Sequence, residues 1–364
     1  MPLRAIIDGK EISSPFLSID EWNKLKEEIK KKSLDVTISQ TTKKGYLRTS
    51  KIGLQHFVHK KEESPPNWKP ELQQQLLAKS EIMLGCKEAG WDVKSEYILN
   101  NCMADVFAVK GSKKIAFQVQ WSRQSYDETK EIQTKYKNDN IRGCWFFKTP
   151  PKEVRDWDKQ IIAIKDIPIF KILEDENKNI NVNVNGIDFP LKKFIIKLLN
   201  GNFKFCTNLQ SRKKQKITIS FWEINCWKCG AKQHVYFVSD ELKSKCGCDI
   251  DVIDTFWDDA KFAFYPTILK MVNEIINSED GKNLKLGKIK KRYSHTARNS
   301  YMSFGCIKCD AIFGDFPLME ERLEIESEDR IKDIVFVKEI ELVNSIISEN
   351  KPHWCFSEKK EFCE

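Results

Sequence analysis

The sequence predicts an α/β (α+β) protein in which a mixed sheet is flanked by helices and a cysteine-rich segment follows. Residues 70–148 have the pattern of a helix, three strands, a second helix and a fourth strand, in that order. Gly111 and Ser112 form a two-residue loop of the kind that closes a tight hairpin. Two C-x-x-C pairs occur in the last part of the chain. We therefore expect a small N-terminal α+β segment (1–62), a central core (63–150), a connecting segment (151–216) and a C-terminal cysteine-rich domain (217–364).

Composition narrows the class of protein. A chain of 364 residues is longer than one hydrophobic core usually supports, and 22 Phe and 10 Trp exclude a disordered chain. The net charge of +8 permits a nucleic-acid partner without requiring one. There is no apolar run long enough to span a membrane and no secretory signal pattern, so we expect a cytoplasmic protein without a membrane partner. In a reducing compartment the twelve cysteines are not explained by disulfides, and metal binding is the leading explanation for those that cluster.

The N-terminal segment is predicted to contain a helix over residues 13–32. Ser18 and Glu21 have the spacing of a capping box, and Trp22 begins an apolar face of helical period. The proline-rich stretch 62–70 is interpreted as a linker or a helix entry.

The central core is predicted element by element. A helix is predicted to begin with Pro70 at its first position, and the apolar periodicity of this helix continues to Gly90. The remaining expected elements are strands 92–99, 103–110 and 113–121, a helix over 125–137 and a strand over 143–148.

The predicted hairpin brings polar side chains together. Pairing around Gly111 and Ser112 places Asp105 directly across from Gln118, with Gln120 on the same face as Gln118. Glu96 of the preceding strand can join them. Buried polar groups need partners. Two interpretations remain open here: a buried hydrogen-bond network, or a divalent cation held by oxygen ligands that would hydrolyse a phosphodiester.

These elements resemble the core of the PD-(D/E)XK nuclease superfamily and, more narrowly, the competence protein CoiA family. The likeness covers roughly residues 43–148. The matching features are the stretch H56-F-V-H59, Glu96 on the first strand, Asp105-Val106 on the second, Q118-V-Q120-W-S122 on the third, Tyr136 near the end of the following helix, and C144-W-F-F147 on the last strand.

The resemblance implies a Mg²⁺- or Mn²⁺-dependent DNA nuclease. It departs from the family at Gln118, where the family has a carboxylate, and the Q-x-Q pattern provides no lysine to stabilise developing phosphate charge. The alternative is a catalytically impaired protein that binds DNA or a protein partner in DNA uptake, repair or phage defence. The implied roles are metal ligation by Asp105 and Gln118 with Glu96 reached through water, orientation of water or phosphate by Gln120, and backbone-phosphate contacts by Ser122, Arg123 and Tyr136, the last of which can equally be a packing residue.

The C-x-x-C pairs predict a structural zinc site. Each pair follows a strand-like run, as in a zinc knuckle, and two facing knuckles give a closed Cys₄ site without an open catalytic position. Cys246 and Cys248 are rival or second-site ligands, and the H-x-C pair of His353 and Cys355 is a weaker source of ligands. The favoured set is Cys226, Cys229, Cys306 and Cys309.

Two basic stretches, 211–216 and 282–292, flank the cysteine-rich segment. They can follow a phosphate backbone, which would make DNA the partner, or form an ordinary solvated face.

Overall fold

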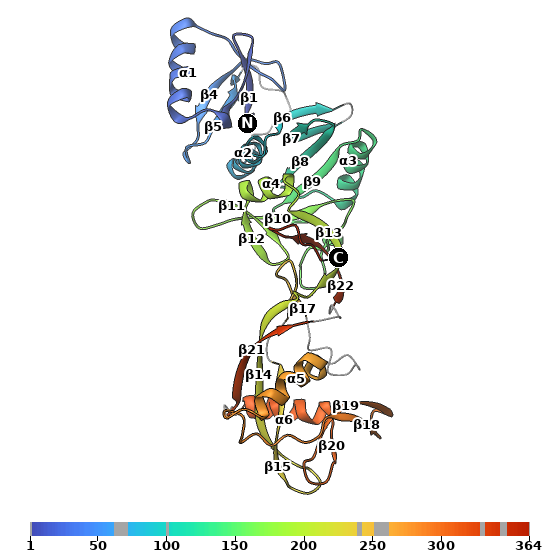
Figure 1. The fold of residues 1–364 in the computed structure, drawn as a ribbon. Coiled ribbons are helices and arrows are strands. Elements are labelled where there is room, and N and C mark those ends of the chain that lie inside the picture. The colour runs from blue at the N-terminus through green and yellow to red at the C-terminus, as the bar shows by residue number, and fades with distance from the viewer. Residues whose placement is uncertain are drawn as a thin grey trace. The chain divides into compact units, whose positions relative to one another are not determined.

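The computed structural model describes residues 2–61, 72–99, 102–238, 242–250, 262–327, 332–342 and 348–363 (Figure 1). The chain forms two compact units. The first comprises Met1–Cys206 and Pro352–Lys360, and the second comprises Thr207–Lys351 and Glu361–Glu364. The boundaries fall inside strands β13 (Phe203–Gln210) and β22 (Ser348–Phe356). The predicted α/β class is confirmed by a seven-stranded mixed sheet with helices in the first unit.

The N-terminal part of the first unit packs a helix beside short strands. The capping box at Ser18 is confirmed, because Ser18 accepts from the Glu21 N–H and Glu21 accepts from the Ser18 N–H. The helix begins later than predicted because Ser14–Phe16 forms a separate 3₁₀ turn that contains a proline. The elements are β1 (Arg4–Ile7), β2 (Lys10–Ser13), α1 (Ile19–Lys32), β3 (Val36–Ile38), β4 (Gly45–Thr49) and β5 (Gln55–His59).

The core sheet of the first unit has the strand order β12-β11-β10-β9-β8-β7-β6. Strand β9 runs parallel to both of its neighbours, β8 and β10, and the other pairs are antiparallel. Its strands are β6 (Asp92–Leu99), β7 (Cys102–Lys110), β8 (Lys113–Gln120), β9 (Arg142–Phe147), β10 (Ile169–Glu174), β11 (Ile180–Val184) and β12 (Ile187–Pro190). Its helices are α2 (Gln73–Glu88), α3 (Tyr126–Asn138) and α4 (Leu191–Leu199), and a 3₁₀ turn spans Lys152–Val154.

The register of the central hairpin is as predicted from Lys110 and Lys113 to Val106 and Phe117, where the pairing ends. The predicted pair of Asp105 and Gln118 lies beyond this end and does not form, because Asp105 accepts the Val119 N–H instead. Residues 151–206, assigned from sequence to a connecting segment, add β10, β11, β12 and α4 to the same sheet and its cover. The sequence pattern does not reveal this, because the pairing of β10 with β9 is parallel and joins residues far apart in the chain.

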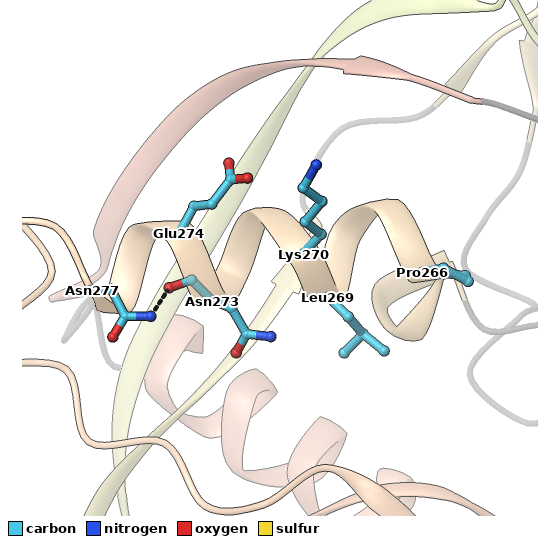
Figure 2. A pocket seen from close by; sticks show the side chains of 6 residues that line it. All are labelled: Pro266, Leu269, Lys270, Asn273, Glu274 and Asn277. Atoms are coloured by element: carbon cyan, nitrogen blue, oxygen red, sulfur yellow. Dashed lines mark hydrogen bonds between the residues drawn. The ribbon is translucent and has the colours of Figure 1, made fainter.

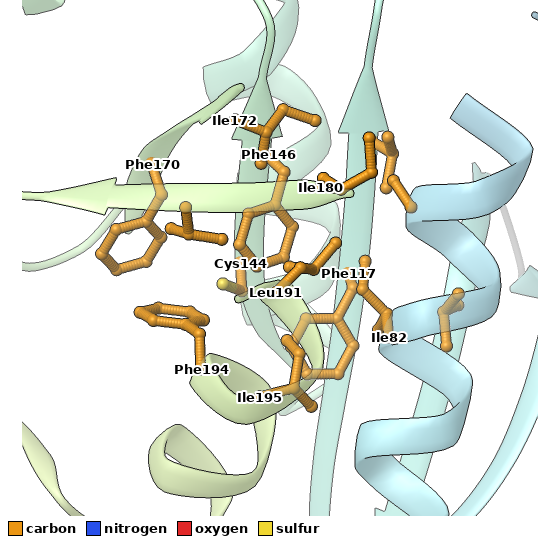
Figure 3. Packing of buried hydrophobic residues seen from close by; sticks show 14 of the residues in the cluster. Ile82, Phe117, Cys144, Phe146, Phe170, Ile172, Ile180, Leu191, Phe194 and Ile195 are labelled. Atoms are coloured by element: carbon orange, nitrogen blue, oxygen red, sulfur yellow. The ribbon is translucent and has the colours of Figure 1, made fainter. Parts of the chain in front are cut away.

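The sheet is buried on both faces. One face carries an apolar cluster with residues of α2 and α4, and the other carries a cluster that includes Tyr136 of α3. In the first cluster Phe194 of α4 contacts Phe146 and Phe170 edge to face, with ring centroids 5.9 and 4.9 Å away (Figure 3). Polar side chains that lie between these layers therefore need partners from the protein itself.

The second unit contains two three-stranded sheets, of order β15-β14-β21 and β18-β19-β20, and the strand pair β16-β17. In the described part of the chain, no helix is both long enough and apolar enough to cross a membrane. The elements of the second unit are β14 (Lys214–Asn225), β15 (Lys232–Val238), β16 (Leu242–Lys243), β17 (Asp249–Ile250), a 3₁₀ turn at Phe262–Phe264, α5 (Pro266–Ile276), β18 (Lys290–Ser294), β19 (Asn299–Gly305), β20 (Ile312–Phe313), α6 (Asp315–Ser327) and β21 (Ile334–Glu341).

Candidate functional site

A fork between β7 and β8 forms the centre of the candidate site. The backbone pairing of the two strands ends at Val106 and Phe117. Beyond this point side chains bind the separated backbone groups. The Val119 N–H donates to Asp105 Oδ2 (2.8 Å), and the Val119 carbonyl accepts from Gln75 Nε2 of α2 (3.1 Å). Asp105 is thus held beside the neighbouring strand by a backbone hydrogen bond.

Glu96 lies beside the same fork in a strained conformation. The pairing of β6 with β7 includes Ser95 with Val106 and Tyr97 with Ala104, but omits the intervening Glu96 and Asp105. Glu96 has a φ of 45°, in the left-handed region, which costs a non-glycine residue about 1–3 kcal/mol. The interruption frees both carboxylates from the regular alternation of the sheet.

Lys79 of α2 connects the two acids. Its Nζ lies 2.7 Å from Asp105 Oδ1 and 3.8 Å from Glu96 Oε1. The side chains of Lys79 and Glu96 are only 1% and 4% exposed, so the ammonium and the two carboxylates form a buried cluster with a net charge of −1. Sequence reasoning missed Lys79. The available signal was its position on the apolar face of a helix, three residues after the buried Leu76.

Gln118 of β8 is held from the side of the sheet that carries α3. Its Nε2 donates to the Met103 carbonyl (2.7 Å) and to the Tyr136 hydroxyl (2.5 Å), and that hydroxyl donates to the same carbonyl (3.2 Å). Burial raises the pKa of Tyr136, so the phenol stays a hydrogen-bond donor. Because the amide nitrogen is engaged in this way, the carbonyl oxygen of Gln118 is the atom left to bind a cation. Tyr136 both packs in the core and orients this amide.

The remaining predicted residues lie at the surface next to this cluster. Gln120, Ser122 and Arg123 line an open hollow of about 380 Å³, together with Glu128 and Glu131 of α3. The structure therefore joins Glu96 and Asp105 through Lys79, holds Gln118 against Tyr136, and places Gln120, two residues along β8, in the adjoining hollow.

The two C-x-x-C pairs come together in the second unit. Each sulfur of one pair lies near a sulfur of the other pair. Cys226 Sγ is 3.7 Å from Cys309 Sγ, and Cys229 Sγ is 3.5 Å from Cys306 Sγ. All four sulfurs lie within 4.8 Å of one another, so the group can hold a metal ion.

The two knuckles share one backbone pattern. The Cys226 N–H donates to the Ala231 carbonyl and the Gly230 N–H donates back to Cys226; residues 306–311 repeat both bonds. The fourth residue after each first cysteine has a positive φ, 71° at Gly230 and 57° at Asp310. Aspartate tolerates this conformation better than most side chains. Asp310 is also held by Arg292 (2.5 Å) and Lys290 (2.6 Å), which lower its pKa to about 2.

The thiol of Cys306 is prepared for ligation. Burial acts to raise its pKa, but the N–H groups of Cys309 and Lys308 point at its sulfur and the pKa falls to about 6. Gln233 of β15 fixes this second knuckle, because its Oε1 accepts from the Ile307 N–H (2.8 Å) and its Nε2 donates to the Gly305 carbonyl (3.2 Å). The metal group is therefore built on ordered backbone.

A second cysteine-rich group that can hold a metal ion is built around Cys246 and Cys363. Cys248 lies beside Cys246, and neither belongs to the group formed by the two knuckles. His353 and Cys355, the other ligand candidates from the sequence, are buried residues assigned to the first unit.

Other features have weaker links to these sites. The histidines of the H-F-V-H stretch are buried in β5, where His59 Nε2 bonds the Thr41 hydroxyl (2.7 Å). A hollow along one face of α5 includes Lys270 and Glu274 (Figure 2), but none of the predicted site residues lines it.

The basic stretches are partly paired with acids. Lys213 and Lys214 both reach Glu341, and Lys290 and Arg292 both reach Asp310. The pairs of Lys213 and Lys214 with Glu341 are exposed, and exposed pairs contribute little to stability.

No protein-family model matches this sequence, and a search of curated proteins found no match.

Proposed function

We propose that this protein is a metal-dependent DNA nuclease of the competence CoiA type, in which Glu96, Asp105, Gln118 and Gln120 form the active site. The observation that carries the proposal is the buried cluster at the β7–β8 fork, where the Lys79 ammonium meets the carboxylates of Glu96 and Asp105 beside Gln118 of the adjacent strand. Such clusters of charged groups are costly to bury and are concentrated at functional sites.

The donor set suits a hard divalent cation. Carboxylate and amide oxygens are the ligands that Mg²⁺ and Mn²⁺ prefer. Asp105 and Glu96 already share one cationic partner, Lys79, so a positive charge between them is favourable. Asp105 and Gln118 would hold Mg²⁺ or Mn²⁺, with Glu96 reached through water. When bound, the metal would activate water and neutralise the scissile phosphate.

Lys79 would supply the positive charge that the Q-x-Q pattern lacks. Its ammonium is already placed among the acidic groups by α2, and its attraction to a phosphate would strengthen as negative charge develops there. Gln120 would orient water or phosphate at the edge of the hollow, where Ser122 and Arg123 would contact the nucleic-acid backbone.

One observation favours the second candidate, a protein that binds DNA or a protein partner without cleaving. Both oxygens of Asp105 already accept hydrogen bonds, one from Lys79 and the other from the Val119 N–H. A metal would have to displace Lys79 from Asp105, and the neutral Gln118 provides less attraction than a carboxylate for doing so.

We assign zinc to the group of four knuckle cysteines. Tetrahedral zinc with Zn–S bonds of about 2.3 Å places its sulfurs about 3.8 Å apart, close to the 3.5 and 3.7 Å found between the knuckles. A closed site of four thiolates contributes folding energy rather than catalysis.

The deciding experiment incubates the full chain with single- and double-stranded DNA in Mg²⁺ or Mn²⁺. Cleavage that is lost in Asp105→Ala and kept in the control Asp158→Ala, an exposed aspartate of the same unit, supports the nuclease. Salt-sensitive binding without cleavage supports the second candidate. Absence of both binding and cleavage at low salt contradicts both.

A further inference from the structure

We propose that Cys246, Cys248 and Cys363 bind a second zinc ion in the second unit, separate from the site formed by the two knuckles. This inference does not depend on nuclease activity. It rests on three thiols, of which Cys246 lies within 3.7 Å of each of the other two.

Two of the thiols come from the tip of a short hairpin. Strands β16 and β17 pair Lys243 with Asp249, and the tip closes through Ser244 N–H to Cys248 O (2.8 Å) and Gly247 N–H to Ser244 O (2.9 Å). Gly247 has a φ of 92°, which a side chain at this position would not tolerate. The turn brings Cys246 Sγ to 3.5 Å from Cys248 Sγ.

The third thiol arrives from the C-terminal end of the chain. Cys363 Sγ lies 3.7 Å from Cys246 Sγ, and Cys363 is 1% exposed. Cys246 therefore has a thiol neighbour on two sides. Both separations are close to the edge of a zinc–thiolate tetrahedron, about 3.8 Å. They also match the 3.5 and 3.7 Å separations between the two knuckles.

The hairpin tip is held firmly where these thiols meet. The Lys245 N–H donates to the Gln210 carbonyl (2.8 Å), and Arg212 donates to Ser244 O through Nε (3.0 Å). The Arg212 guanidinium also lies against Gly247, 3.4 Å from the position that a Cβ atom would take there. A cation beside this turn would offset part of the negative charge that three thiolates bring to a zinc site.

A disulfide does not account for this arrangement. A disulfide would join two of the thiols and leave the third beside it, whereas a soft divalent metal uses all three. Three thiolates leave one position of a tetrahedron for a further ligand.

The test is the zinc content of the full chain, measured by elemental analysis after purification with zinc under reducing conditions. We expect two zinc ions per chain, one in Cys363→Ser, one in Cys226→Ser/Cys306→Ser and none when all three substitutions are combined. The control Cys102→Ser, a half-buried cysteine outside both groups, should keep two. One zinc in the wild type, or two in Cys363→Ser, would overturn the proposal.

A second measurement guards against variants that fail to fold. In a Cys226→Ser/Cys306→Ser background, which leaves the knuckles only two thiols, Co²⁺ added alone should give thiolate-to-cobalt charge-transfer bands that disappear with Cys246→Ser. Retention of these bands in Cys246→Ser would overturn the proposal.

Discussion

Lys79 Nζ lies 2.7 Å from Asp105 Oδ1 in the interior of the first unit, joining a helix to the strand that carries the predicted metal ligand. The ammonium is also 3.8 Å from Glu96, so a single cation faces two acids. The ammonium compensates part of the buried negative charge. Whether a metal can displace Lys79 from Asp105 distinguishes the two candidate functions.

Replacement of Lys79 tests whether it neutralises the acids. Lys79→Met leaves two facing carboxylates without their cation, and we expect a loss of about 3–5 kcal/mol in the free energy of unfolding. Urea denaturation measures this loss, with the exposed Lys113→Met as control. Millimolar Mn²⁺ should restore part of the loss, because a cation that binds only the folded state stabilises it. A loss as small as that of the control would contradict the account.

The amide of Gln118 should matter more for its donor than for its size. Gln118→Glu replaces the donor to Met103 with a second acceptor, and we expect a destabilisation of about 1–3 kcal/mol near neutral pH. Gln118→Leu, which removes the polar group, is the comparison. The extra cost of glutamate should shrink on acidification, when the carboxyl gains a proton and can donate. Equal stability of Gln118→Glu and wild type in chemical denaturation would refute this role.

The first unit should lose stability in mild acid through His56. Burial lowers the pKa of His56, and its Nε2 has no hydrogen-bond partner within the described residues. The unfolded chain takes up a proton below its ordinary pKa of about 6.5, while the folded protein resists protonation. Stability should therefore fall as the pH drops below this value.

Thermal melts of wild type and His56→Gln from pH 7.5 to 5 test this dependence. The variant should show a shallower decline. A decline of the same slope in both proteins would show that His56 is not responsible.

The positive φ angles of Gly230 and Asp310 predict different effects of substitution on zinc release from the two knuckles. Gly230→Val forces a branched side chain into the left-handed region, with a cost of about 1–2 kcal/mol. Asp310→Gly suits the backbone but loses the contacts with Arg292 and Lys290. We expect Gly230→Val to release zinc to a chelator faster than wild type, and faster than Asp310→Gly. The reverse order would contradict the shared knuckle geometry.

Local signals in the sequence predict most elements of the core. The capping box of Ser18 and the hairpin at Gly111 depend on residues close together in the chain, so the local sequence is enough to predict them. The hairpin register also identifies Asp105 and Gln118 as near neighbours. The two knuckles follow from cysteine spacing for the same reason.

Contacts between distant residues were beyond the sequence. Lys79 reaches Asp105 from a helix that packs across the sheet, and no spacing rule links the two. Cys363 contacts Cys246 although the two residues are far apart in the sequence. The alternation of side chains along a strand would place Ala104 on the same face as Val106. Ala104 instead joins the cluster of Phe107, because the β6–β7 pairing is interrupted beside Asp105.

The rate of cleavage of end-labelled DNA in Mg²⁺, compared between wild type and Asp105→Asn, tests the central claim most directly. The substitution keeps the size of the side chain and removes the charge that would hold the metal. We predict cleavage by wild type and a fall of about a hundredfold or more in the variant. Equal rates in the two proteins, or no cleavage by wild type under any divalent cation, would contradict the assignment of a nuclease site at Asp105.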